Sequence, residues 1–229
     1  MSGAGDKELK ALYEVRFQEK LLRKKNAVWK VLCKEFFSKW IAPEDTVVDV
    51  AAGYCEFINN IQAKKKFAFD LNPDVLKYAG KERGGVIPVV ASCFDIGKYI
   101  RQGQADVFFV SNFLEHLADK DEVACLIKEL AHLVKPGGRL LILQPNIRLV
   151  GGKYWDFFDH KVGLTEKALI ELAETCGLKT ETCVPRFLPY TTKSAMPQGA
   201  FLVWLYLKLM PFSGLVFGEQ SFMVYRKLK

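Results

Sequence analysis

The stretch TVVDVAAGY at residues 46–54 and the run KFAFD at residues 66–70 decide the fold class of this chain. Each is an apolar segment with an acidic residue at or near its end, and Asp70 follows Asp49 by 21 residues. A strand, a turn of small residues, a helix start and a second strand ending in a carboxylate form the layout of a nucleoside-binding α/β half. Small residues let the backbone approach a ligand, and the second carboxylate suits ribose hydroxyls.

The glycine pattern of this turn is incomplete, because Ala51 and Cys55 stand where a G-x-G-x-G pattern has glycine. An ordinary tight turn between a strand and a helix is therefore an alternative interpretation. Alanine at position 51 is compatible with the turn if its φ stays negative. We expect Cys55 to pack at the helix start rather than to act as a reactive thiol.

Further apolar runs continue the strand pattern along the chain. The runs predicted as strands are TVVDV (46–50), KFAFD (66–70), VIPVVA (86–91), ADVFFV (105–110) and RLLILQ (139–144). They are nearly continuous in apolar residues, which is typical of a parallel sheet that is covered on both faces.

Helical spacing of apolar residues predicts the elements between the strands. Helices are expected near 55–63, 73–80, 119–134 and 166–176, the last between Thr165 as its cap and Gly177 as its stop. Residues 135–138 read as a sharp turn, 180–187 as an irregular stretch with a proline, and 221–227 as the last strand.

The N-terminal segment is basic. Residues 1–40 carry ten Lys or Arg against five Asp or Glu, within a net charge of +7 for the chain. Their apolar spacing predicts two helices, 7–22 and 26–41, with the polar residues 23–26 between them. Such a segment could meet nucleic acid, anionic lipid or an anionic substrate, or it could be a solvated helix face.

Length and composition describe one globular domain with at most an accessory lobe: the chain has 229 residues, of which 50% are hydrophobic. The six cysteines form no C-x-x-C and no metal-type spacing with the three histidines, so the sequence predicts no metal site. The first 20 residues lack the apolar core of a signal peptide. We therefore expect reduced thiols and a cytoplasmic location.

Five segments, in this order, resemble the motifs of the class I S-adenosylmethionine-dependent methyltransferases. They are VVDVAAGYCEF (47–57), FAFDLNPD (67–74), VVASCFDI (89–96), ADVFFVSNFLEHL (105–117) and LVKPGGRLLILQPN (133–146). The resemblance covers about residues 45–229, and SNFLEHL followed by KPGG is its most specific part. The segment from GGKYWDFFDH (151–160) onward is most similar to small bacterial methyltransferases of glycans and secondary metabolites.

The resemblance implies an α/β, Rossmann-like sheet of seven mostly parallel strands in the order 3-2-1-4-5-7-6, with strand seven antiparallel. Residues 1–42 would form a helical lid and residues 43–229 the methyltransferase domain. Within that domain we expect a substrate loop at 146–165 and an apolar insertion at 186–217.

The resemblance also implies S-adenosylmethionine as the methyl donor and S-adenosylhomocysteine as its product. Asp70 would bind the ribose, Leu71 would pack on the adenine, and Asn112 would face the methionine end. The family's acidic adenine ligand falls at Ser92, so Ser92 with the Cys93 backbone, or else Asp95, is expected to read the adenine. The full set of expected donor-binding residues is Tyr13, Arg16, Asp49, Ala51, Gly53, Tyr54, Asp70, Leu71, Ser92, Cys93 and Asn112.

Tyr13 and Arg16 belong to that set as lid residues. Together with Phe17 they lie on the helical face that a lid would turn toward the donor. Arg16 would pair with the methionyl carboxylate, and Tyr13 would close the pocket against water. In the alternative, Tyr13 and Phe17 are core contacts and Arg16 is a surface charge.

Candidate catalytic residues concentrate in the aromatic loop GGKYWDFFDHKVG (151–163). Methyl transfer needs alignment, exclusion of water and in some cases removal of a proton. His160 beside Asp159 is the best candidate for a base, and His116 is a second. A packed loop with a hydrogen-bonded histidine is the alternative for His160, and a structural histidine is the alternative for His116.

The segment GAFLVWLYLKLMPFSGLVF (199–217) is strongly apolar, but its uninterrupted runs are too short to span a bilayer. A cover on the sheet edge, a dimer surface and a shallow peripheral membrane contact remain open for it. The oligomeric state expected is a monomer or a homodimer.

Three functions remain open. The first is methylation of a small-molecule, glycan or lipid-linked acceptor, and the second is methylation of RNA or protein. The basic N-terminus favours RNA, but SNFL (111–114) replaces the N-P-P-Y pattern, so nucleic acid is not the favoured partner. The third is a non-catalytic nucleoside-binding scaffold, which the departures at Ala51 and Ser92 keep open.

Overall fold

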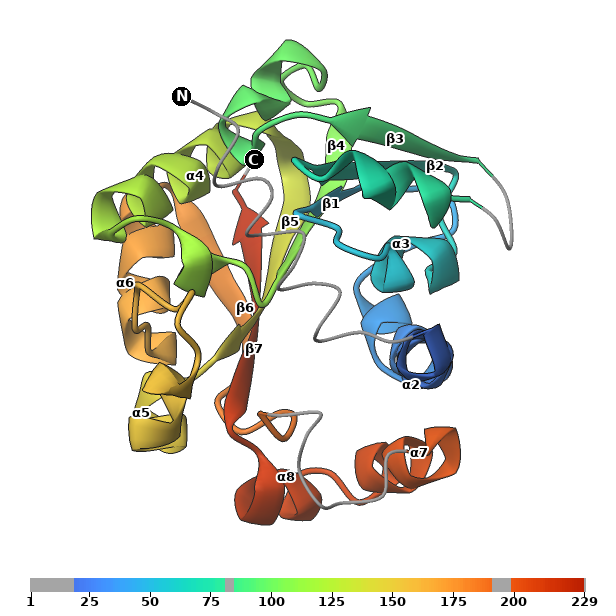
Figure 1. The fold of residues 1–229 in the computed structure, drawn as a ribbon. Helices are drawn as coiled ribbons and strands as arrows, with labels where there is room; N and C mark the ends of the chain where they lie inside the picture. The colour runs from blue at the N-terminus through green and yellow to red at the C-terminus, as the bar shows by residue number, and fades with distance from the viewer. Residues whose placement is uncertain (1–18, 81–84, 191–198, 229) are drawn as a thin grey trace.

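The protein is a seven-stranded mixed sheet covered by helices on both faces (Figure 1). The structure, a computed structural model, describes residues 19–80, 85–190 and 199–228. The strand order is β3-β2-β1-β4-β5-β7-β6, as predicted. The strands are β1 (Thr46–Val50), β2 (Lys65–Asp70), β3 (Val86–Val90), β4 (Ala105–Ser111), β5 (Val134–Pro145), β6 (Leu178–Val184) and β7 (Gln220–Lys227).

Five of the strands have their carboxyl ends at the same edge of the sheet. Strands β1 to β5 are parallel, whereas β7 runs antiparallel to both β5 and β6. The loops that follow β1, β2, β3, β4 and β5 therefore all leave from the same carboxyl edge. Ligands of open α/β sheets bind at this edge, outside the strand ends.

Helices cover both faces of the sheet. Figure 1 shows α4 (Lys120–Leu133) and α6 (Glu166–Thr175) on one face, and α2 (Glu19–Glu35) and α3 (Glu56–Asn60) on the other. The shorter elements are α5 (Ile147–Val150), α7 (Ala200–Lys208), α8 (Phe212–Phe217) and the 3-10 turns η1 (Phe37–Lys39), η2 (Pro73–Lys77), η3 (Cys93–Lys98), η4 (Leu114–His116) and η5 (Gly151–Asp156).

The two faces of the sheet carry two separate hydrophobic cores. Neighbouring strand residues alternate between them, with Phe108 facing the α4–α6 side and Phe109 the α2–α3 side. The second core is rich in aromatic residues: the fully buried Phe37 contacts the rings of Trp29, Phe36, Phe57, Phe109, Phe187 and Phe222. Burial on both faces explains the continuous apolar runs of the strands.

The predicted boundary between two N-terminal helices is wrong. Residues 23–26 lie inside the single helix α2, which ends at Glu35 rather than 41. Lysine and arginine are good helix formers, so a polar run does not break a helix. The lid residues Tyr13, Arg16 and Phe17 lie outside the described residues.

Two further differences concern the strands β6 and β5. Residues 178–184 form the strand β6 and not an irregular stretch, because they pair with β7 up to Val184, just before Pro185. The predicted turn at 135–138 lies within the bounds of β5, where the pairing of Val134 with Ala105 jumps to that of Arg139 with Val107. The Pro-Gly-Gly residues therefore bulge out of a strand that resumes beyond them.

Both ends of α6 follow the sequence prediction. The Thr165 hydroxyl accepts a hydrogen bond from the Ala168 N–H at 3.1 Å, and Gly177 takes φ +77° after the last turn. None of the helices in the described ranges is both long enough and apolar enough to cross a bilayer.

Candidate functional site

The turn after β1 holds two non-glycine residues in the left-handed region. Ala51 has φ +56° and Cys55 has φ +60°, with Gly53 at +52° between them. The condition under which alanine is compatible with this turn, a negative φ, is therefore not met. Strained backbone of this kind persists where the surroundings impose it, and it concentrates at functional sites.

The carboxylate of Asp70 fixes the same turn. Its Oδ2 accepts a hydrogen bond from the Gly53 N–H at 2.8 Å, and its Oδ1 accepts one from the Asn72 N–H at 2.8 Å. Burial raises the pKa of this carboxyl, and the backbone donors offset part of the rise. The Leu71 backbone N–H also acts on this carboxylate. Asp70 thus joins the end of β2 to the turn after β1.

Asp49 lies beneath this turn and is only 3% exposed. Burial is the main cause that raises its pKa well above the usual range, and the nearby carboxyls of Glu56 and Asp70 add to the rise. Lys25 of α2 reaches Glu56 with an Nζ–Oε1 distance of 3.1 Å. The described part of the N-terminal segment therefore brings a positive charge to the carboxylates beneath the turn.

The remaining expected donor residues surround this turn. Leu71, next to Asp70, is 62% exposed, which leaves an apolar surface beside the carboxylate. The Ser92 hydroxyl caps η3 by accepting from the Phe94 N–H at 3.2 Å, and Cys93 is buried. Tyr54 packs edge-on against Tyr78.

Burial raises the pKa of the Cys55 thiol, which is fully buried at the start of α3. A thiol that is held protonated is a poor nucleophile. Cys55 therefore packs at the helix start, as its position in the sequence predicted.

Asn112 ends β4 with φ +47° and is exposed at the carboxyl edge. Its backbone N–H donates to the Leu143 carbonyl at 2.9 Å, which ties the loop to β5. Asn146 at the end of β5 is instead buried, where its Nδ2 donates to Glu166 and Ser221. It is a structural residue that holds α6 to the sheet.

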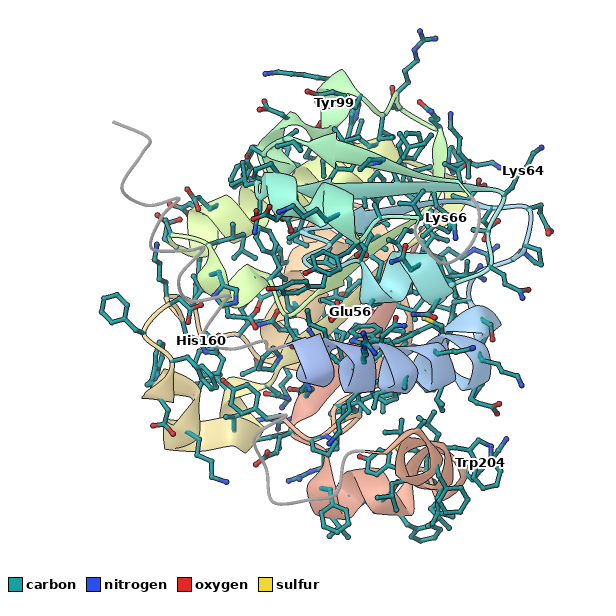
Figure 2. All side chains as sticks on the ribbon, turned by 45° about the vertical axis from the view of Figure 1, so that its right-hand side comes forward. Glu56, Lys64, Lys66, Tyr99, His160 and Trp204 are labelled. Atoms are coloured by element: carbon teal, nitrogen blue, oxygen red, sulfur yellow. The ribbon has the colours of Figure 1, made fainter. Side chains whose placement is uncertain are left out.

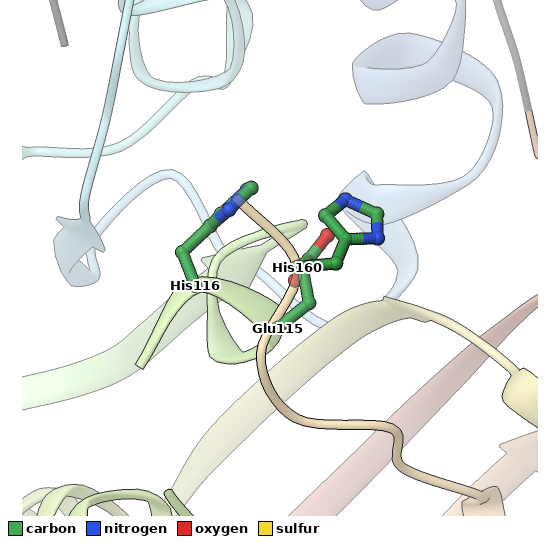
Figure 3. A group of neighbouring side chains, drawn as sticks. All are labelled: Glu115, His116 and His160. Atoms are coloured by element: carbon green, nitrogen blue, oxygen red, sulfur yellow. The ribbon is translucent and has the colours of Figure 1, made fainter. Parts of the chain in front are cut away.

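A second cluster of polar side chains comes from η4 and from the loop that follows η5. Figure 3 shows the Glu115 carboxyl group between the imidazole rings of His116 and His160, whose centroids are 5.2 Å apart. Two backbone hydrogen bonds hold the loop in place, from the N–H groups of Lys161 and Val162 to the Glu115 carbonyl at 2.8 and 3.2 Å. The structure thus brings together His116, Asp159 and His160, all three expected catalytic residues.

The partners of the two histidines differ from the sequence interpretation. The Asp159 carboxylate lies 3.4 Å from Nδ1 of His116, whose Nδ1 is also 3.1 Å from the Asp159 carbonyl. His160 Nδ1 lies 2.9 Å from the Tyr154 carbonyl and 3.4 Å from the Tyr190 hydroxyl. Asp159 therefore contacts His116, which adds a partner that its place next to His160 in the sequence did not indicate.

These contacts assign the tautomer of each ring. A carbonyl oxygen only accepts, so Nδ1 of both histidines carries the proton and Nε2 carries the lone pair of the neutral ring.

The sequence analysis missed Glu115, Tyr154 and Tyr190 as partners of these rings. Only Glu115 had a signal, because it precedes His116 directly.

The Glu115 side chain is 2% exposed, and burial raises its pKa. Its Oε2 and the polar atoms of the buried Gln144 are enclosed, and a weak interaction between these two side chains is the only one they make within the described structure. Polar atoms that are buried in this way are the places where a ligand, water or ion is expected.

The same three side chains could hold a cation. Glu115, His116 and His160 each offer one ligand atom, and these atoms lie within 4.8 Å of one another. Two imidazoles and a carboxylate suit Fe²⁺, Mn²⁺ or Zn²⁺. Spacing along the chain did not predict this set, because its members come from segments 44 residues apart.

The strain at Ala51 leads to a stability prediction. Ala51→Gly removes the steric penalty of a positive φ and adds some freedom to the unfolded chain, so we expect the free energy of unfolding to rise by about 0.5 kcal/mol. Ala52→Gly is the matched control, because Ala52 is buried and has no positive φ, and it should lower that free energy by about 1 kcal/mol. Urea denaturation measures both, and equal losses would contradict the assigned turn.

Burial of Glu115 leads to a prediction on pH. Because its folded pKa is raised, the native protein binds a proton more tightly than the unfolded chain, and stability is lost as pH rises through that pKa. Glu115→Gln lacks this loss, so its unfolding free energy relative to the wild type should increase as pH rises above 4.5, the ordinary pKa of a glutamate side chain.

His116 and Asp159 are the charged neighbours that act on Glu115, and both are present in the wild type and in Glu115→Gln, so the two proteins are compared with each other across pH. Glu171→Gln, at an exposed position on α6, is the control and should follow the wild type. Thermal denaturation across this pH range checks the result, and a constant difference between Glu115→Gln and the wild type would contradict it.

Comparison with known proteins identifies the fold. Residues 48–142 match the family model of the methyltransferase domain. A S-adenosylmethionine-dependent methyltransferase from Archaeoglobus fulgidus superposes with a TM-score of 0.61 at 16% identity, covering 96% of this chain and 99% of that one. One from Mesorhizobium loti gives 0.61 at 13% identity, over 86% of this chain and 98% of that one.

A third structure, geranyl diphosphate C-methyltransferase from Streptomyces coelicolor, was solved with Mg²⁺, geranyl diphosphate and S-adenosyl-L-homocysteine. It superposes with a TM-score of 0.60 at 14% identity, over 85% of this chain and 76% of that one. No curated protein sequence matches this chain. The fold that the motif resemblance implied is confirmed: residues 48–142 match the methyltransferase domain model, and the chain has the fold of the class I S-adenosylmethionine-dependent methyltransferases.

Proposed function

We propose that this protein transfers a methyl group from S-adenosylmethionine to a small-molecule, glycan or lipid-linked acceptor. The observation that carries the proposal is the meeting, at one carboxyl edge, of the strained turn after β1, the Asp70 carboxylate and the Glu115–His116–His160 group. The fold of the family and its methyltransferase domain support the choice of donor.

The residues at the turn fit the donor. A methyl group added at Gly53 would meet no atom within 4 Å, so space is open above the turn. The Asp70 carboxylate would bind the ribose, and the exposed Leu71 would contact the adenine. When bound, the donor supplies an electrophilic methyl group on a sulfonium.

His160 would accept the acceptor's proton at Nε2. The Tyr154 carbonyl holds its Nδ1–H, which keeps the lone pair on the opposite side of the ring. Asp159 would hold His116 in the same way, as a second positioned imidazole. The alternative role of this group, as ligands of a divalent cation, uses the same Nε2 atoms together with Glu115.

One of the solved structures supports the choice of acceptor. The structural neighbour from Streptomyces coelicolor acts on geranyl diphosphate, a small anionic molecule with an apolar chain. Methylation of RNA or protein and a non-catalytic scaffold remain the alternatives, and a cytoplasmic location remains an expectation. Transfer of a radiolabelled methyl group into the lipid, small-molecule, RNA and protein fractions of a cell extract separates these acceptor classes.

Asp70→Asn tests donor binding. We expect the affinity for S-adenosylhomocysteine to fall by at least about tenfold, or 1.4 kcal/mol, because the neutral amide replaces a charge-assisted acceptor. Isothermal titration calorimetry measures the change. Asp121→Asn, on the exposed first turn of α4, is the matched control and should bind as the wild type does. No binding by the wild type would favour the scaffold.

His160→Ala tests the base. Loss of a positioned proton acceptor should lower the rate of radiolabel transfer by about 10²- to 10⁴-fold while S-adenosylhomocysteine binding stays unchanged. His132→Ala, on the exposed side of α4, is the control. Transfer at the wild-type rate would remove His160 from the mechanism. Activity that a chelator abolishes and Mn²⁺ restores would assign the group to a metal instead.

A further inference from the structure

The helices α7 and α8 carry an unusual distribution of side chains. Helix α7 reads AFLVWLYLK, which is apolar around its whole circumference, yet it contains no buried residue. A helix of this composition is normally enclosed by other elements or by lipid. Here one side packs on the aromatic core through the half-buried Val203, Leu207 and Met210, and the other side is exposed.

The polar groups of these helices are used for attachment to the rest of the protein. The Tyr206 hydroxyl donates to the Phe187 carbonyl at 2.6 Å, and the Ser213 hydroxyl donates to the Tyr206 carbonyl at 2.7 Å. Lys208 Nζ lies 3.1 Å from Glu35 Oε2 on α2. The Tyr206 and Lys208 contacts therefore fix the pair of helices to the rest of the protein, and the Ser213 contact joins the two helices to each other.

Apolar side chains are left on the outside. The most exposed are Phe212 at 76%, Val216 at 70% and Phe201 at 69%. We define the outer apolar surface as Phe201, Leu202, Trp204, Leu205, Leu209, Phe212, Leu215, Val216 and Phe217, all of which are exposed. Figure 2 shows Trp204 on α7 at the lower edge of the molecule.

The size of this surface exceeds that of scattered apolar residues. Its four aromatic side chains alone expose on the order of 450 Å², since a fully exposed aromatic residue presents about 200 Å². Apolar patches on monomeric proteins rarely exceed a few hundred Å², and larger ones mark protein or membrane contacts.

A basic helix borders the outer apolar surface. Helix α2 packs against α7, and Figures 1 and 2 both show the two helices side by side. Residues 22–35 of α2 carry five Lys or Arg against one Glu, a net charge of +4, and Lys24, Lys30 and Lys34 are exposed. Apolar aromatic side chains next to basic ones are the pattern of helices that lie in the interface of an anionic bilayer.

We propose that the outer apolar surface docks this protein on an anionic lipid bilayer, with Phe and Trp side chains in the headgroup region and the basic side chains of α2 at the lipid phosphates. A second copy of the chain fits this surface less well, because a two-fold contact would bring two helices of charge +4 together.

The position of the outer apolar surface favours one class of methyl acceptor. This inference about the acceptor alone rests on the proposed function. Helix α8 ends at Phe217, just before Gln220, which pairs with Pro145 at the carboxyl edge of β5. Docking would therefore hold this edge close to the bilayer. A lipid-linked acceptor would then reach the site without leaving the membrane.

Vesicle co-sedimentation of the full chain, without any donor, tests the docking. The probes are phosphatidylcholine vesicles with and without phosphatidylglycerol. We expect the wild type to bind the anionic vesicles and to be released by salt, because screening weakens the contribution of the lysines. Phe212→Ser combined with Val216→Ser should weaken binding by about tenfold or more.

Two variants complete the design. Leu228→Ser is the matched control, because Leu228 is also 60% exposed but follows the opposite end of β7, and it should bind as the wild type does. Lys30→Glu combined with Lys34→Glu should lose the preference for anionic vesicles. Calorimetry with S-adenosylhomocysteine shows that each variant is folded and separates a failure of docking from a failure of the proposed function.

Failure of the wild type to bind anionic vesicles would overturn the proposal, as would binding that the Phe212 and Val216 variant retains. A dimer that this variant dissociates, seen by light scattering in the absence of vesicle binding, would assign the surface to a second copy.

Discussion

The hydrogen bond from the Gly53 N–H to the Asp70 carboxylate is the contact on which the donor half of the site depends. It links the turn after β1 to the end of β2 over 2.8 Å and holds the turn in a backbone shape that Ala51 and Cys55 would not adopt alone. The cost is a carboxylate taken out of water, which the raised pKa of Asp70 records. Charge-assisted hydrogen bonds from the backbone offset that cost.

The two halves of the site are built differently. Apart from Asn112 after β4 and the expected lid residues, the donor half comes from short segments that follow β1, β2 and β3, so these residues lie near one another in the sequence as well as in space. The acceptor half joins η4 to the loop around His160 and to Tyr190, which are far apart in the chain. A change in the acceptor loop can therefore alter the acceptor pocket while the donor turn stays as it is.

This difference explains how much the sequence could predict. The parallel core and the donor turn follow from local patterns, because each motif is one strand with the turn behind it, whereas the strand order followed only from the resemblance to the family. Residues 178–184 have the alternating exposure of an edge strand that is bonded on one side only, and their polar composition concealed them. The pairing of Asp159 with His116 was hidden by the neighbouring His160, since adjacency in sequence says little about side-chain direction in a loop. The jump in register at 135–138 depends on the neighbouring strand, which no local pattern describes.

The position of β7 has a consequence for how the chain folds. This strand lies between β5 and β6 although it follows both in sequence, so neither can complete its hydrogen bonding until β7 is available. During synthesis the first five strands can assemble with α4, while β5 presents an open edge of the kind that pairs with other chains. The helices α7 and α8 emerge just before the strand that closes this edge. The most apolar segment of the protein is therefore exposed during the interval in which the sheet is still incomplete, and this interval is the stage at which a chaperone or a nearby bilayer would protect the chain from aggregation.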